Sequence, residues 1–258
     1  MRLKGNTIFI TGGGSGIGRG FAEAFHKLGN KVIIAGRRRG RLDAVVAANP
    51  GMTAFELDIA DPASIEGAAK RLISEYPDVN VLINNAGIMQ PDRAAGYIDD
   101  ALLVDTINTN LIGPIRMTAA LIEHLKHKDA AVVAYTSSVL GFVPLALTAV
   151  YSATKAALHS YALSQRFMLR DSKIRLLEII PPWVRTELMN SQDAGQAMPV
   201  GQFISEAMRV LGSDADEIVI DAAKAMRGNA GAAEHAFVSS FNERGLSIFS
   251  ETSEWDGG

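Results

Sequence analysis

The sequence predicts one α/β domain built on a doubly wound parallel sheet of about seven strands, with helices on both faces. Three observations support this fold class. Short β-branched runs alternate with helix-like segments along the chain. Each run is almost wholly apolar, which is typical of parallel strands covered on both faces. No repeat, low-complexity tract or Pro/Ser-rich linker divides the chain, so residues 1–258 are expected to form a single domain.

The expected elements follow one another in β-α order. Strands are expected at Thr7–Thr11, Lys31–Ala35, Thr53–Leu57, Val79–Asn84, Ala131–Thr136, Ile174–Ile180 and Glu217–Ile220. Helices are expected at about Ile17–Leu28, Arg41–Ala48, Pro62–Tyr76, Asp100–Lys126, Tyr151–Arg170 and Gly201–Leu211. Right-handed crossovers between these strands place a ligand crevice beyond their carboxyl ends.

Two stretches show neither the hydrophobic periodicity of a helix nor that of a strand. Residues 188–200, within which Met189–Val200 is rich in Gln, Asn, Gly and Pro, are a candidate substrate lid. A passive surface connection is an equal alternative for that stretch. The residues before the C-terminus lack strand character, so 244–258 are expected to form a loose tail.

Composition restricts the possible partners and compartment. Hydrophobic residues make up 48% and charged residues 21%, as in a globular protein with an extensive core. A net charge of −3 makes a nucleic-acid partner unexpected, and the lack of cysteine excludes disulfides and thiolate metal sites. The first strand begins directly after Met1–Lys4, and no apolar run is long enough to span a bilayer. A cytoplasmic protein without a membrane partner is therefore expected.

One helix carries a candidate acid/base pair. Tyr151 and Lys155 are four residues apart and so share a helix face, and Ser138 lies upstream. A phenol loses its proton near pH ~10, so proton exchange near neutrality requires a stabilised phenolate. The Lys155 ammonium is expected to lower the Tyr151 pKa by direct charge attraction. The alternative is a chance pair, with a half-buried phenol and a solvated ammonium.

A glycine-rich turn follows the first strand and opens a helix. In Thr11–Gly18, glycines permit a tight turn and bring backbone N–H groups close to a pyrophosphate at the helix N-terminus. At the end of the second strand, Gly36 stands where a carboxylate would accept a ribose hydroxyl, and Arg37 follows it. A guanidinium suits a 2′-phosphate, so NADP(H) is expected rather than NAD(H). The alternative is a solvated basic loop, which is the favoured account of Arg39 and Arg41.

Together these residues resemble the classical short-chain dehydrogenase/reductase (SDR) family from about Thr7 to Thr186. Further matching segments are Leu57-Asp58-Ile59, Asn84-Asn85-Ala86-Gly87, Asn110-Leu111-Ile112-Gly113 and Ser138-Val139-Leu140-Gly141. The resemblance implies a Rossmann-type fold and four catalytic residues: Asn110, Ser138, Tyr151 and Lys155. It implies cofactor contacts from Gly12, Ser15, Gly16, Ile17, Gly18, Arg37, Asp58, Ile59, Asn85, Ala86, Gly87, Tyr151, Lys155, Pro181, Val184 and Thr186. No metal site is expected, and His159 is interpreted as a packed or interface residue.

The implied reaction is reversible hydride transfer between NADP(H) and a carbonyl or secondary alcohol of a small substrate. Side chains available near the strand ends suggest an apolar compound: Met89, Leu140, Phe142, Val143, Trp183, Leu188 and Met189. The resemblance implies a homodimer or homotetramer, because the helices that bear Asn110 and Tyr151 commonly pair across a dimer in this family, although an intrachain core also explains their apolar residues. Two alternatives remain: a sugar-nucleotide epimerase or dehydratase, and a non-catalytic NADP(H)-sensing module. The chain departs from the family at Pro181-Pro182-Trp183, where Pro-Gly is common.

Overall fold

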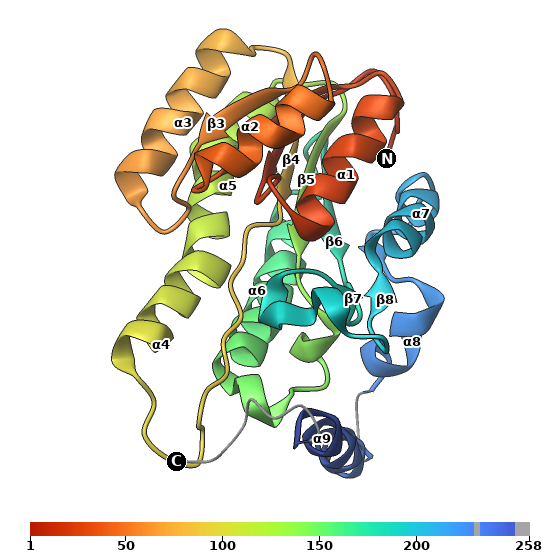
Figure 1. The fold of residues 1–258 in the computed structure, drawn as a ribbon. Helices are drawn as coiled ribbons and strands as arrows, with labels where there is room; N and C mark the ends of the chain where they lie inside the picture. Colours follow the sequence, from red (N-terminus) through yellow and green to blue (C-terminus); the bar gives the residue numbers. More distant parts are fainter. Residues whose placement is uncertain (230–232, 251–258) are drawn as a thin grey trace.

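A parallel sheet forms the centre of the computed structural model, which describes residues 1–229 and 233–250 (Figure 1). Its strands are β1 Thr7–Thr11, β2 Lys31–Gly36, β3 Thr53–Glu56, β4 Val79–Asn84, β5 Ala131–Thr136, β6 Ile174–Ile179 and β9 Glu217–Ile218. Their order is β3-β2-β1-β4-β5-β6-β9, and every neighbouring pair is parallel. The predicted Rossmann-type, doubly wound sheet of about seven strands is confirmed.

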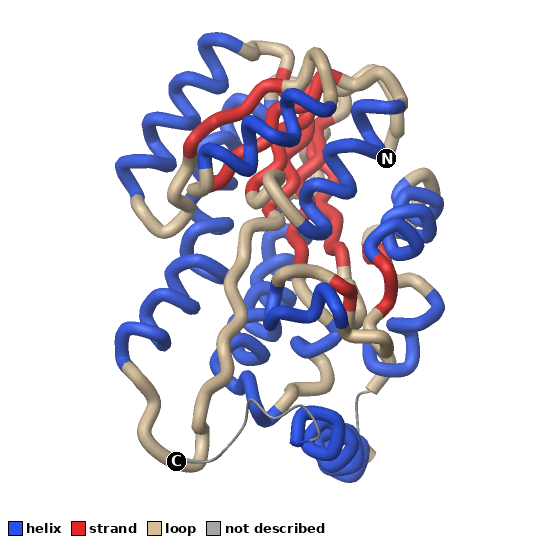
Figure 2. Tube along the Cα trace, viewed as in Figure 1, coloured by secondary structure: helices blue, strands red, loops and turns tan. Residues whose placement is uncertain are grey.

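Helices cover both faces of this sheet (Figure 2). One core contains buried residues of α1 (Gly16–Lys27), α2 (Arg39–Ala48), α7 (Val200–Leu211) and α8 (Asp221–Arg227). The other contains residues of α3 (Pro62–Glu75), α5 (Gly113–Lys126) and α6 (Ala149–Met168). Successive residues of a strand point to opposite faces: on β1, Ile8 and Ile10 join the first core and Phe9 joins the second. The strands are therefore apolar on both sides, as their sequences predict.

The strand order reverses between β1 and β4, which pair with each other. The chain leaves β1 toward β2 and leaves β4 toward β5, on opposite sides of this point. The connections therefore diverge and open a crevice at the carboxyl ends of the two strands. The glycine turn after β1 and the Asn85-Ala86-Gly87 segment after β4 both begin there.

The long helix predicted at Asp100–Lys126 is interrupted. It consists of α4 (Asp100–Ile107), a π-helical turn at Asn108–Ile112, and α5. Hydrophobic periodicity does not reveal such a turn, because a single wide turn changes the spacing of few apolar residues. The turn carries Asn110, one of the four predicted catalytic residues.

The C-terminal third differs most from expectation. Residues 188–200 contain a 3-10 helix at Leu188–Asp193 and a short strand β8 (Met198–Pro199) paired with β7 (Val184–Arg185). A helix α9 covers Glu234–Ser250 and so includes residues 244–250 of the stretch expected to form a loose tail, while 251–258 lie outside the described residues. Within the described part of the chain, no helix is long and apolar enough to cross a membrane.

Candidate active site

The acid/base pair is buried on the first half of α6. Tyr151 is 6% exposed and Lys155 is 3% exposed. The Lys155 Nζ donates a 2.8 Å hydrogen bond to the carbonyl oxygen of Thr136, at the end of β5, and lies 5.4 Å from the centre of the Tyr151 ring. Burial lowers the pKa of Lys155 to about 8, and the Glu178 carboxylate opposes that fall. The alternative of a half-exposed phenol with a solvated ammonium does not fit this geometry.

The pKa of Tyr151 differs from the sequence prediction. Burial raises it to about 12, and a hydrogen bond with Ser138 is the group interaction that lowers it. The predicted lowering by Lys155 is thus not seen among the chain's own groups. The physical reason is that Lys155 lies beside the ring, with its ammonium directed to the Thr136 carbonyl. Ser138, which begins the 3-10 turn Val139–Gly141, is the group placed on the phenol itself.

Asn110 lies in the π-helical turn and is 1% exposed. Its Oδ1 accepts a 2.8 Å hydrogen bond from the Ile88 N–H, and its Nδ2 donates at 2.8 Å to the Ile88 carbonyl. A Cβ on Gly87 would lie 3.3 Å from Asn110 Oδ1 and 3.7 Å from Lys155 Nζ. Asn110 and Lys155 therefore face the same glycine, and all four predicted catalytic residues gather around the ends of β4 and β5.

The glycine turn is packed too closely for side chains. Gly12 and Gly16 have φ of +69° and +53°, in the left-handed region that favours glycine. A Cβ on Gly18 would lie 2.4 Å from the Gly12 carbonyl oxygen and from Asn85 Nδ2. The turn opens α1, whose N-terminal N–H groups attract a negative charge. It thus forms a cradle whose backbone can approach a diphosphate.

Thr11 and Asn85 hold this cradle against β4. The Thr11 hydroxyl accepts hydrogen bonds from the N–H groups of Asn85 (3.0 Å) and Ala86 (3.1 Å). Asn85 Nδ2 donates to the Thr11 carbonyl at 3.2 Å and to the Gly12 carbonyl at 3.4 Å. The predicted residues Asn85 and Ala86 are therefore part of the support of the glycine turn.

The remaining predicted cofactor residues surround the same crevice. Asp58 Oδ1 accepts from the Ala60 N–H at 2.9 Å and shapes the turn after β3, in which Ile59 is buried. At the opposite end, the Pro181 carbonyl accepts from the Val139 N–H at 3.1 Å, which links the segment after β6 to the Ser138 turn. Val184 is buried on β7, and a Cβ on Gly16 would lie 3.2 Å from Thr186 Cγ2. Thr186 therefore closes over the glycine turn.

The arginines after β2 divide into two groups. Arg37 is exposed and makes no hydrogen bond or ion pair with any described residue. Arg38, which sequence reasoning did not select, donates to Ser15 Oγ at 3.1 Å and to Glu187 Oε2 at 3.1 Å. Arg41 also pairs with Glu187 and is an exposed surface residue, in keeping with the solvated-loop alternative. The two guanidinium groups hold the pKa of Glu187 below its ordinary value.

This arrangement fits a nicotinamide dinucleotide. The glycines leave space where a Cβ would collide, the helix N-terminus favours a diphosphate, and a basic cluster lies at the end of β2. A Cβ on Gly36 would meet only Leu42 Cδ2, at 3.8 Å, so position 36 is open and supplies no carboxylate, while the nearby Glu187 carboxylate is paired with Arg38 and Arg41. The crevice can hold the dinucleotide between this end and the Tyr151 cluster.

Comparison with known proteins agrees with the geometry. The short chain dehydrogenase family matches residues 6–197. The chain belongs to the short-chain dehydrogenase/reductase family. It is 41% identical over 190 residues to an uncharacterized oxidoreductase, DltE, of Bacillus subtilis, covering 73% of this chain and 75% of that protein. It is 31% identical over 227 residues to an NADP-dependent 3-hydroxy acid dehydrogenase of Schizosaccharomyces pombe, covering 85% and 87% of the two chains.

Solved structures share the fold of this SDR protein. A short chain dehydrogenase from Burkholderia cenocepacia in complex with NADP has a TM-score of 0.82 at 24% identity, over 93% of this chain and 98% of that one. A 3-ketoacyl-(acyl-carrier-protein) reductase from Brucella melitensis complexed with NADH has a TM-score of 0.75 at 28% identity, over 83% and 93%. The chain is thus an SDR oxidoreductase by family and by fold.

Apolar side chains flank the catalytic end of the crevice. Trp183 and Leu188 are each 36% exposed, on the segments that bound β7, and Leu140 and Phe142 are partly buried beside Ser138. Val143, by contrast, is fully buried and belongs to the packing beneath this surface. Asn242 on α9 donates to the Pro144 carbonyl at 3.0 Å and accepts from the Ala146 N–H. The C-terminal helix, unforeseen from the sequence, therefore contacts the loop that carries Leu140, Phe142 and Val143.

Proposed function

We propose that this SDR protein catalyses reversible hydride transfer between NADP(H) and a carbonyl or secondary alcohol of a small, apolar substrate. The observation that carries the proposal is the buried cluster of Ser138, Tyr151, Lys155 and Asn110 at the mouth of a glycine-lined crevice. A non-catalytic sensing module would not need these four residues together.

The chain's own residues divide the proton chemistry among them. When bound, NADPH supplies the hydride. Tyr151 is protonated at neutral pH, because burial raises its pKa, and so it is able to give its phenolic proton to a substrate oxygen. Ser138, already hydrogen-bonded to the phenol, is placed to hold the same oxygen. Lys155 would return a proton toward Tyr151 and hold ribose hydroxyls, and Asn110 would position a water beside it.

Preference for NADP(H) rests on the end of β2. Gly36 supplies no carboxylate, and Arg37 is free to bind a phosphate dianion. The relatives do not decide between NADP(H) and NAD(H), because one relative is NADP-dependent and one solved neighbour is complexed with NADH. The proposed preference for NADP(H) therefore rests on the arginines of this chain. The apolar surface formed by Trp183 and Leu188 supports an apolar substrate.

A homodimer or homotetramer is proposed as well. The far end of α6 exposes three large apolar side chains, Leu163 (45%), Phe167 (65%) and Met168 (75%). Such a patch on a helix favours association with a second copy. Light scattering of the wild type and of Phe167→Glu tests this; a monomeric wild type contradicts it. A cytoplasmic location stays a prediction.

Turnover is the direct test of the function. Purified protein is mixed with NADPH and a panel of ketones, aldehydes and 3-oxo acid derivatives, and the reverse reaction is run with NADP⁺, secondary alcohols and 3-hydroxy acids. We expect at least one apolar carbonyl to be reduced with strict dependence on Ser138 and Tyr151. If no carbonyl or alcohol is turned over although NADPH binds tightly, the protein is a sensing module.

A further inference from the structure

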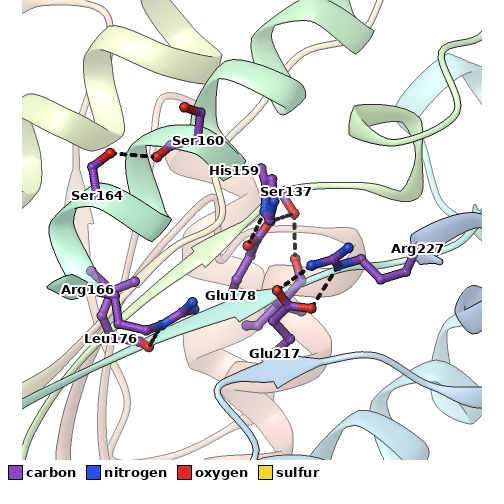
Figure 3. A network of polar contacts seen from close by, with 10 residues as sticks. Ser137, His159, Ser160, Ser164, Arg166, Leu176, Glu178, Glu217 and Arg227 are labelled. Atoms are coloured by element: carbon purple, nitrogen blue, oxygen red, sulfur yellow. Dashed lines mark hydrogen bonds and ion pairs between the residues drawn. The ribbon is translucent and has the colours of Figure 1, made fainter. Parts of the chain in front are cut away.

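A carboxylate is buried in the middle of the sheet beside the active site. Glu178 lies on β6 between Leu177 and Ile179 and is 0% exposed. Its Oε1 accepts a 2.5 Å hydrogen bond from Ser137 Oγ, and its Oε2 lies 2.7 Å from His159 Nδ1 (Figure 3). A carboxylate in such a place is costly unless it is hydrogen-bonded or paired with a charge. Both of its oxygens have partners here.

These partners are direct neighbours of the catalytic groups. Ser137 stands between Thr136, whose carbonyl accepts from the Lys155 Nζ, and Ser138, which bonds to Tyr151. His159 follows Lys155 by four residues on α6 and so lies one turn further on the same face. Two short connections therefore tie the Glu178 carboxylate to the strand end and the helix that hold the catalytic pair.

Arg227, Arg166 and Glu217 carry the other charges of this network. Arg227, on α8, gives two hydrogen bonds to Glu217, at 2.8 Å and 2.7 Å, and covers the ring of Phe142 at 4.4 Å. Arg166, on α6, directs its Nε to the Leu176 carbonyl, and its buried Nη2 has no hydrogen-bond partner among the described residues. Figure 3 shows Arg227, Glu217 and Arg166 together with Glu178. The carboxylate of Glu217 is therefore hydrogen-bonded to Arg227, whereas Glu178 contacts Ser137 and His159, and its charge acts on both Lys155 and Arg227.

A cation at this cluster is disfavoured. The ligand-type atoms of His159, Glu178 and Glu217 lie within 4.8 Å of one another. Both oxygens of Glu217 are, however, occupied by the Arg227 guanidinium, which itself supplies the positive charge. A metal ion would have to displace that guanidinium and remain beside it, at a large electrostatic cost.

We propose that Glu178 is a positioning residue of this active site, whose buried carboxylate keeps Lys155 in its charged ammonium form. The consequence for turnover rests on the hydride-transfer function proposed above, whereas the effect on Lys155 itself does not. Burial alone would drive Lys155 toward the neutral amine. A neutral Lys155 could neither supply a proton toward Tyr151 nor donate with all three hydrogens.

Burial and the Glu178 carboxylate shift the pKa of Lys155 in opposite directions. Burial lowers the pKa of Lys155 to about 8, and Glu178 is the charged group that raises it. Loss of the carboxylate should therefore lower the Lys155 pKa further, so that the ammonium is lost at a lower pH. Near neutrality, an increasing fraction of the protein would then hold Lys155 in its neutral form.

The test follows the titration of Lys155 by NMR in protein labelled at the lysine ε-carbon, with the resonance assigned from Lys155→Met. Glu178→Gln removes the charge and retains the shape, with one acceptor oxygen replaced by an NH2 donor, and Glu178→Asp retains the charge. We expect the Lys155 midpoint to fall by about half a unit to one unit in Glu178→Gln and to stay near the wild-type value in Glu178→Asp. The matched control, Glu217→Gln, should change it far less.

An unchanged Lys155 midpoint in Glu178→Gln overturns the proposal, as does an equal shift in Glu217→Gln. Thermal melts show whether each variant is folded. If Glu178→Gln unfolds at too low a temperature for the titration, Glu178→Leu replaces it, since a leucine suits an otherwise apolar strand. A lowered Lys155 midpoint in that variant supports the proposal, and an unchanged midpoint overturns it. The titration needs no substrate, so it stands even if the wild type proves inactive. With an active wild type, the basic limb of the kcat/KM profile should move to lower pH by the same amount in Glu178→Gln.

Discussion

Selection of the cofactor should depend on Arg37. Its guanidinium has no partner among the described residues, so a 2′-phosphate can bind it without breaking an existing interaction. A hydrogen bond to a charged group contributes about 1.5–3 kcal/mol, so Arg37→Ala should weaken NADPH binding about tenfold to a hundredfold. NADH, which lacks the phosphate, should bind unchanged. Arg38 would have to leave its exposed ion pair with Glu187, worth about 0.2–1 kcal/mol, before it could bind the phosphate. Arg38→Ala should therefore reduce NADPH affinity less than Arg37→Ala does.

Calorimetric titration of NADPH and NADH measures both affinities in each variant. Arg39→Ala is the matched control, because Arg39 pairs with Asp43 along α2. The double variant Gly36→Asp with Arg37→Ala should reverse the preference, and Gly36 has space for the new side chain since a Cβ there approaches only one atom, at 3.8 Å. The reasoning is refuted if Arg37→Ala weakens both cofactors equally, or if the wild type binds NADH as tightly as NADPH.

Three further predictions concern the same crevice. Lys155→Met should lower both turnover and cofactor affinity, and unchanged NADPH affinity by titration would contradict its ribose-binding role. Gly18→Ala should abolish cofactor binding or lower the melting temperature, because its Cβ would lie 2.4 Å from Asn85 Nδ2. The control, Gly14→Ala, should leave cofactor binding and the melting temperature nearly unchanged, because its Cβ would lie 3.4 Å or more from its neighbours. Residues 188–200, fixed at their base by the β7–β8 pair, should gain hydrogen-exchange protection when cofactor and substrate bind, and equal protection would leave a passive loop.

Local patterns were sufficient for the sheet and for much of the site. Strands buried on both faces have continuous apolar sequences, so β4 and β5 were predicted with their observed bounds. The glycine turn and the Tyr151–Lys155 spacing are local as well, because each depends on neighbouring residues of one element. Periodicity also located most helices to within about two residues.

Features that depend on contacts between distant segments were missed. Arg38 and Glu187 are 149 residues apart in the chain, and no local pattern indicates that they pair. Helix α9 was missed because its sequence alone lacks a clear boundary signal. Glu178 did leave a signal, since a charged residue stood within an apolar strand, and a buried charge of that kind commonly marks a functional site. The direction of the Tyr151 pKa shift was wrong because the extent of burial is a property of the whole fold.

The central claim is that Tyr151 is the proton donor of a hydride-transfer reaction. The most direct measurement compares NADPH turnover and NADPH affinity in the wild type and in Tyr151→Phe, with the carbonyl substrate found in the panel. Loss of a general acid costs about 10²–10⁴-fold in rate, while the ring and its packing remain. We expect turnover to fall by at least about a hundredfold, with NADPH affinity within a few-fold of wild type. A Tyr151→Phe protein that retains more than about a tenth of wild-type turnover would contradict the account.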